Sequence, residues 1–187
     1  MRGFTLVEML VVIGMVAILG GIAFVSFRPG NESLALDRAS HRIAQDIRRA
    51  TSLALEAKSI NNCTSPDKPA SGYGVYVAKS NPTEYIIYGD CDHTSGSSKE
   101  GYKSGKDVIL ETIILEAPTL IDSLTVDGAA EGDWSIAFFP PTPVVAICVD
   151  DKCDTKSGQA SLVLADKNNT ALRKTIKVYA SGIVDIE

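Results

Sequence analysis

The chain has 187 residues, a net charge of −5 and an isoelectric point of about 5.1. A net negative charge of this size argues against a protein that binds nucleic acid over a broad face, although it does not exclude a small basic patch. Once the apolar N-terminal stretch is set aside, the remainder is long enough for one domain with its own hydrophobic core.

An apolar run occupies the N-terminus. Between Thr5 and Phe27 the only strongly polar side chains are those of Thr5, Glu8 and Ser26. A helix over this run would be roughly 35 Å long. The hydrocarbon core of a bilayer is ~30 Å thick, so this length is sufficient to cross it with some tilt. We therefore expect a single transmembrane helix over 4–27, since a helix satisfies its own backbone polar groups in lipid.

A cleaved secretory signal peptide does not fit this segment. The apolar run is longer than the core of such a peptide, and no small-residue cleavage site precedes a polar start. We expect the span to be retained, with the N-terminus in the cytoplasm because Arg2 precedes it, and with the globular domain outside the cytoplasm. A lone carboxylate at Glu8 is costly in such a span and usually has a partner or a purpose.

A second helical pattern follows the span and continues over 28–58. Arg28-Pro29-Gly30-Asn31 predicts a kink or short break, after which the helix is expected from about Ser33 to Lys58. Its apolar stripe consists of Leu36, Ala39, Ile43, Ile47, Ala50, Ala54 and Ala57. The opposite face mixes Arg38, Arg42, Arg48 and Arg49 with Asp37, Asp46 and Glu56. This pattern predicts an amphipathic helix with a salt-bridged outer face.

The remainder, 59–187, changes to the two-residue period of strands. We predict strands over 74–78, 84–88, 107–115, 120–126, 134–139, 144–149, 159–165, 174–180 and 183–186. The segment 91–106 is rich in Gly, Ser and Lys and is expected to be a long exposed loop. The fold class is therefore α+β, with a long N-terminal helix packed on antiparallel sheet.

Four cysteines lie in this β-rich part. Their even number beside a membrane segment favours two disulfides outside the cytoplasm, and four cysteines allow three pairings. The pairing Cys63–Cys91 is favoured because these residues flank the ends of one hairpin, and Cys148–Cys153 because these residues bracket one tight turn. A zinc site made by all four thiolates is the alternative, although Cys63 and Cys91 are too far apart in sequence for the usual paired spacing.

Other polar clusters are weaker candidates. His41 lies among arginines on a solvated helix face, and His93 lies in a loop with no second histidine near it in sequence. Neither comes with a nucleophile and an orienting group, so we do not expect an enzyme or a cofactor. Asp150, Asp151 and Asp154 offer oxygen ligands for calcium, but acidic hairpin turns are common and the spacing is not that of an EF-hand.

The start of the chain resembles a known family. Gly3-Phe4-Thr5-Leu6-Val7-Glu8 followed by an apolar helix is similar to the class III signal of type IV pilins and type II secretion pseudopilins. The resemblance implies cleavage between Gly3 and Phe4 by a prepilin peptidase, which would remove a leader of residues 1–3. It also implies N-methylation of Phe4 and assembly with other pilins through the helix, with Glu8 as the family's glutamate.

The nine predicted strands resemble the two-sheet minor pseudopilins of the general secretion protein H (GspH) and FimT kind. The segment 177–186 is also similar to the last hairpin of that group. The resemblance implies a minor subunit of a type II secretion pseudopilus or type IV pilus, held in the inner membrane before it joins a filament. Its partners would be other pilins, the prepilin peptidase and the inner-membrane assembly platform.

A DNA-binding minor pilin of a competence pilus is the alternative function. FimT-like pilins that bind DNA resemble one another in an Arg-rich motif after the final glycine. Here Gly182 is followed by Ile183-Val184-Asp185-Ile186-Glu187, without arginine. Together with the acidic net charge, this departure argues against DNA capture.

Overall fold

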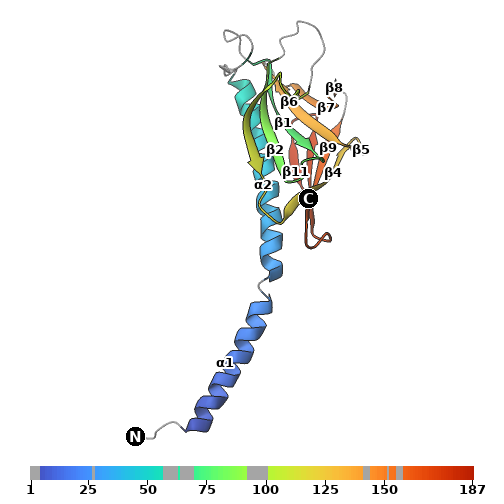
Figure 1. The fold of residues 1–187 in the computed structure, drawn as a ribbon. Helices are drawn as coiled ribbons and strands as arrows, with labels where there is room; N and C mark the ends of the chain where they lie inside the picture. Colours follow the sequence, from blue (N-terminus) through green and yellow to red (C-terminus); the bar gives the residue numbers. More distant parts are fainter. Residues whose placement is uncertain are drawn as a thin grey trace. The chain divides into compact units, whose positions relative to one another are not determined.

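The computed structural model describes residues 5–26, 28–56, 63, 70–91, 101–140, 144–150, 152–154 and 158–187. The chain divides into two compact units, Met1–Leu34 and Ala35–Glu187, which we call the N-terminal unit and the β unit. Helix α1 (Leu6–Ser26) and the first residues of α2 (Arg28–Leu55) belong to the N-terminal unit. The rest of α2 and all strands belong to the β unit (Figure 1).

The helix boundaries differ from those expected. Helix α2 begins at Arg28, so the predicted start near Ser33 is wrong, and so is a break over 28–31. The kink that we predicted as the alternative to a break stays a prediction. Pro29 falls in the first turn of α2, where a missing N–H is tolerated because the first N–H groups of a helix have no intrahelical partner. Helix α2 ends at Leu55, and residues 57 and 58, which we expected to continue it, lie outside the described residues.

The apolar stripe predicted for α2 is buried. Leu36, Ala39, Ile43, Ile47, Ala50 and Ala54 are all at most 6 % exposed and belong to the main core cluster. The seventh predicted member, Ala57, lies outside the described residues. Packing of this stripe, rather than helix propensity alone, holds α2 against the strands.

Two antiparallel sheets form the rest of the β unit. The strands are β1 (Gly72–Ala78), β2 (Glu84–Asp90), β3 (Val108–Ile114), β4 (Thr119–Val126), β5 (Ala129–Glu131), β6 (Asp133–Phe139), β7 (Val144–Val149), β8 (Lys152–Asp154), β9 (Gln159–Asp166), β10 (Arg173–Tyr179) and β11 (Val184–Ile186). One sheet has the order β3-β2-β1-β6-β7-β8 and the other β11-β10-β9-β4-β5. The predicted α+β fold with antiparallel sheet is confirmed.

The hydrophobic core is shared by both sheets and α2. Val75 and Ile136 come from the six-stranded sheet, Leu162 and Ile176 come from the five-stranded sheet, and all four are at most 1 % exposed. The Trp134 indole N–H on β6 donates to a backbone carbonyl of β9 at 3.4 Å, which joins the two sheets. All described residues that form the buried apolar core lie between 35 and 178, so this core belongs entirely to the β unit.

Both disulfides expected from the sequence are present. Cys63–Cys91 has a Cα–Cα distance of 5.4 Å and joins residues 28 apart in sequence, and Cys148–Cys153 joins residues 5 apart. No cysteine is free, so the structure does not agree with a zinc site made by four thiolates. The second disulfide links β7 to the short strand β8.

We expected the segment after β2 to be a long exposed loop, but part of it packs against the sheet. Residues 92–100 lie outside the description, but Gly101 is buried and the Tyr102 ring packs 4.6 Å from Tyr76 and 5.2 Å from Tyr88. The Tyr102 N–H also donates to the Ser135 hydroxyl at 3.3 Å. This part of the segment therefore covers one face of β1, β2 and β6, because aromatic packing supplies more burial than the Gly- and Ser-rich composition indicated.

Candidate assembly site

Thr5 and Glu8 organise the start of α1. The Thr5 carbonyl accepts the Glu8 N–H at 3.1 Å, and the Thr5 hydroxyl oxygen accepts the same N–H at 3.3 Å. Thr5 is therefore the N-cap, and Glu8 stands at the third helical position, which is the glutamate position of a capping box. Our sequence analysis did not predict this capping role, although the Thr-x-x-Glu spacing indicates it.

Glu8 also carries the only charge in α1. Its side chain is exposed in the first helical turn, where the partial positive charge of the helix N-terminus stabilises a carboxylate. Gly3 and Phe4, between which we predict cleavage, lie outside the described residues. The site that the structure shows is therefore the capped helix start and its one carboxylate.

Helix α1 presents large apolar side chains on every side. From Leu6 to Ile22 these side chains are between 47 % and 81 % exposed. A helix that is apolar all round needs other apolar groups around it, and so large an exposed apolar surface marks an interaction site. No helix within the described part of the chain is both long and apolar enough to span a membrane. The transmembrane assignment of 4–27 remains a prediction.

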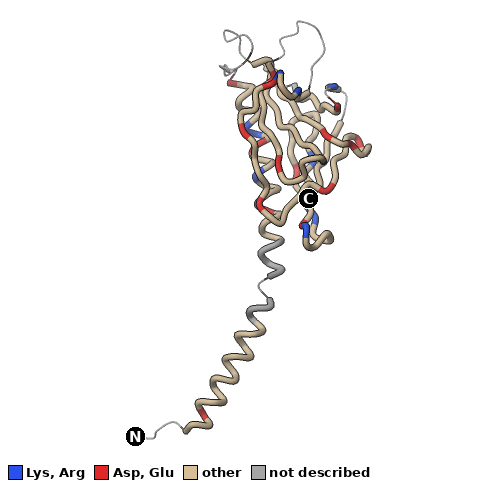
Figure 2. Tube along the Cα trace, in the orientation of Figure 1, with Lys and Arg blue, Asp and Glu red and all other residues tan. Residues whose placement is uncertain are grey.

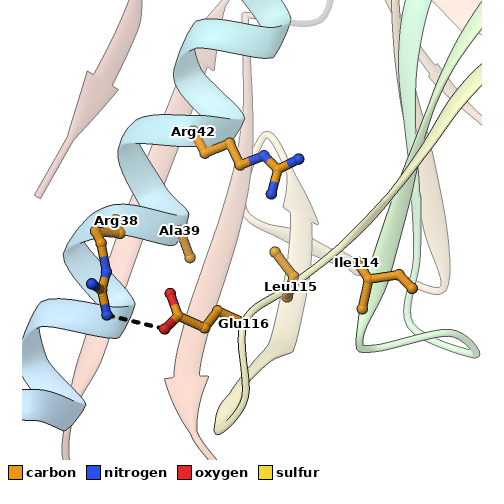
Figure 3. A pocket seen from close by; sticks show the side chains of 6 residues that line it. All are labelled: Arg38, Ala39, Arg42, Ile114, Leu115 and Glu116. Atoms are coloured by element: carbon orange, nitrogen blue, oxygen red, sulfur yellow. Dashed lines mark hydrogen bonds and ion pairs between the residues drawn. The ribbon is translucent and has the colours of Figure 1, made fainter.

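A small hollow lies beside α2 in the β unit. Arg38, Ala39 and Arg42 line it from α2, and Ile114, Leu115 and Glu116 line it from the end of β3 and the residues after it (Figure 3). Its volume of about 50 Å³ is far below the roughly 300–1,000 Å³ of ligand pockets. The hollow therefore has room for water but not for a substrate.

The salt-bridged face predicted for α2 exists, but its partners come from other elements. Arg38 lies 3.1 Å from Glu116 and Arg49 lies 2.7 Å from Glu111. Both pairs are largely exposed, so each contributes only about 0–1 kcal/mol to stability. Figure 2 shows acidic and basic residues interspersed along the β unit, and several of them form ion pairs, among them Arg173 with Asp122 and Lys174 with Asp37.

One buried phenol joins α2 to the six-stranded sheet. Tyr85 on β2 is 1 % exposed, and its hydroxyl donates to Asp46 of α2 at 2.5 Å. Burial, and next this hydrogen bond, raise the pKa of Tyr85 well above its ordinary value, while the nearby Arg42 guanidinium partly opposes them. Tyr85 is thus held protonated, as a structural donor rather than as a base.

The polar candidates are not brought together. His41 is exposed on α2, and His93 lies outside the described residues. Of the acidic turn, Asp151 also lies outside them, and the side chain of Asp154 is not described. Within the described ranges, no group of three or more His, Cys, Asp or Glu side chains is arranged to hold a metal ion.

Comparison with known proteins identifies the N-terminal segment. Residues 1–24 match the prokaryotic N-terminal methylation motif, which is the signal of type IV pilin-like proteins. This match covers the segment with Gly3, Phe4 and Glu8 and does not extend into the β unit. Neither a curated protein nor a solved structure matches the chain.

Proposed function

We propose that the chain is a minor subunit of a type II secretion pseudopilus or a type IV pilus. A prepilin peptidase would cleave it between Gly3 and Phe4, and Phe4 would be N-methylated. The processed chain would rest in the inner membrane by a single span before it joins other pilins in a filament. The role is structural and not enzymatic.

The methylation motif on an apolar helix with one carboxylate carries this proposal. The exposed apolar surface of α1 is suited first to lipid and then to neighbouring helices. Transfer between these two surroundings is governed by packing, because lipid tails are about as apolar as the side chains of α1. The same helix can therefore serve as an anchor and later as part of a filament core.

Glu8 would set the register of assembly. Cleavage before Phe4 exposes an α-amino group, and a neighbouring subunit can present that amine to the carboxylate. An unpaired carboxylate in an apolar core would cost several kcal/mol or take up a proton, so packing with the amine in place is strongly favoured. The exposure of Glu8 in the isolated chain leaves the carboxylate available for such a partner.

The β unit supports the finer assignment to minor pseudopilins of the GspH and FimT kind. Proteins of that group resemble one another in having a helix packed on two sheets. Here α2 packs on sheets of six and five strands. Cations at the C-terminal end are balanced by carboxylates, as in the contact of Lys177 with Glu187 at 2.6 Å. This balance argues against DNA uptake as the role of the displayed unit.

Two substitutions at Glu8 test the assembly role. Glu8→Gln keeps a residue that a capping box accepts but removes the charge, whereas Glu8→Ala removes both. We expect both variants to be processed and retained in the membrane fraction, and both to be lost from sheared filaments. Incorporation is measured by immunoblotting the sheared-filament fraction from cells that express the complete assembly system.

Ser26→Ala at the other end of α1 is the matched control and should enter filaments as the parent does. Intact mass must show that every variant begins at Phe4, so that a processing defect is not mistaken for an assembly defect. If Glu8→Gln is incorporated normally and Glu8→Ala is not, Glu8 acts only at the start of the helix and its charge does not set the register. Normal incorporation of both would overturn the register role.

A further inference from the structure

The two sheets have four edges, and β3 differs from the other three. The edge strands β5, β8 and β11 have three residues each, whereas β3 has seven. Very short edge strands are one way in which proteins avoid pairing with another chain. Of the described strands, only β2 is hydrogen-bonded to β3, which Figure 1 shows in olive at the margin of its sheet.

The side chains of β3 do not protect its edge. Ile109, Leu110 and Ile114 are 48 %, 41 % and 70 % exposed, and the strand contains neither proline nor lysine. Its single charged residue, Glu111, is paired with Arg49 of α2 at 2.7 Å. The pairing of β3 with β2 shifts register at Leu110, but it is regular from Glu111 to Ile114. A regular, largely apolar stretch on an exposed edge is a template for strand addition.

The backbone direction along β3 identifies the groups that are open to a partner. The Leu115 N–H donates to the carbonyl of Thr83, beside β2, at 2.8 Å. Because the direction of N–H and C=O alternates along a strand, Ile113 and Glu111 also point toward β2. The peptide groups of Thr112 and Ile114 then point outward, and within the described residues no backbone group pairs with them.

We propose that β3 pairs antiparallel with β3 of a second copy of this chain, about a two-fold axis at Thr112. The two Thr112 residues would exchange both backbone hydrogen bonds, and Glu111 of each copy would lie opposite Ile113 of the other. These residues belong to the part of β3 from Glu111 to Ile114 that pairs regularly with β2. A register centred on Glu111 would instead oppose two carboxylates, which is unfavourable. The register that the outward peptide groups of β3 allow therefore also keeps the two Glu111 carboxylates from lying opposite each other.

This dimer would join the six-stranded sheets of two copies into one continuous sheet. It requires only the β unit, which contains the complete described core, so it does not depend on α1 or on the proposed filament. Failure of filament assembly and failure of strand pairing can therefore be observed separately.

Sedimentation of the full chain in detergent over a range of concentrations measures the dimer. Thr112→Pro removes the N–H at the centre of the pairing, and an edge strand tolerates proline when that N–H faces solvent. Ile114→Lys adds a charge to the exposed edge. We expect each variant to weaken dimerisation by at least about tenfold, because each change acts twice across the two-fold axis and edge charges oppose pairing.

Ile183→Lys is the matched control, because Ile183 is 62 % exposed just before β11 in the other sheet. It should dimerise like the parent, and circular dichroism should show that all variants keep the parent's strand content. A parent that stays monomeric up to the highest soluble concentration would overturn the proposal. Unchanged dimerisation of both edge variants would also overturn it.

Cross-linking of the full chain in detergent tests the register directly. In a hydrogen-bonded antiparallel pair the opposed Cα atoms are about 5.5 Å apart, which is within the range of a disulfide. Thr112→Cys should therefore form covalent dimers on mild oxidation, whereas Ile109→Cys, which the proposed register does not oppose to itself, should form few. Equal cross-linking of the two variants would contradict the two-fold axis at Thr112.

Discussion

Gly74 on β1 lies where the backbone and an aromatic ring approach most closely. A Cβ atom at this position would lie 2.5 Å from the Ile136 carbonyl oxygen and 2.7 Å from the Tyr88 ring. Tyr88 is fully buried and packs against Tyr102, so its ring cannot easily move aside. The absence of a side chain at Gly74 therefore allows the aromatic cluster to pack on the sheet.

We expect Gly74→Ala to lower the free energy of unfolding by about 1–3 kcal/mol, which is typical of overpacking in a core. Urea denaturation of the β unit measures the change. Gly132→Ala is the control, because a Cβ there would meet nothing within 4 Å. Equal stability of the two variants would show that the Tyr88 ring has room to move.

Local residue patterns predicted most of the buried positions but missed the turn before β5. The six described positions of the α2 stripe are buried, because a 3.6-residue period specifies one face of a helix. Our reading missed Asp127-Gly128, whose φ angles of 48° and 85° make the tight turn before β5. An Asp-Gly pair between apolar residues signals such a hairpin, because both central residues need positive φ.

Strands could be predicted one by one, but their arrangement could not. Nine strands of the structure overlap predicted ones, and the three-residue strands β5 and β8 were missed. The partition into sheets follows from long-range pairing: β6 joins β1, and β9 joins β4. Sequence periodicity records which side of a strand is buried but carries no information about its neighbour, so the two-sheet order had to come from the structure.

The two disulfides constrain very different lengths of chain. Cys63–Cys91 closes a loop of sequence separation 28, whereas Cys148–Cys153 closes one of separation 5. If a disulfide acts mainly on the entropy of the unfolded chain, the first contributes about 3.6 kcal/mol and the second about 2 kcal/mol. The longer loop should therefore be the more important for stability.

We expect Cys63→Ala with Cys91→Ala to lower the unfolding free energy by about 1.5 kcal/mol more than Cys148→Ala with Cys153→Ala. Guanidinium denaturation of the β unit measures both double variants. Alanine is chosen because a serine hydroxyl at Cys148, which is 1 % exposed, would be buried without a designed partner. A larger loss for the short loop would show that local packing of β7 and β8 outweighs chain entropy.

The N-terminal unit and the β unit differ in whether their apolar side chains are exposed or buried. The described part of α1 has apolar side chains exposed on every side, whereas the β unit buries the complete described core and carries ion pairs on its surface. The N-terminal methylation motif lies wholly within the N-terminal unit. The segment that would insert and assemble is thus distinct from the segment that would be displayed.

This division predicts that the β unit folds without the N-terminal unit. Residues 35–187 and the full chain, compared in the same detergent, should have thermal midpoints within about 3 °C, the shift that roughly 1 kcal/mol produces in a domain of this size. Differential scanning calorimetry measures both. Residues 35–187 should also stay monodisperse after the detergent is removed, while the full chain should aggregate because α1 exposes its apolar surface. A midpoint more than about 6 °C lower without residues 1–34 would mean that they stabilise the β unit by well over 1 kcal/mol, and the division would be wrong.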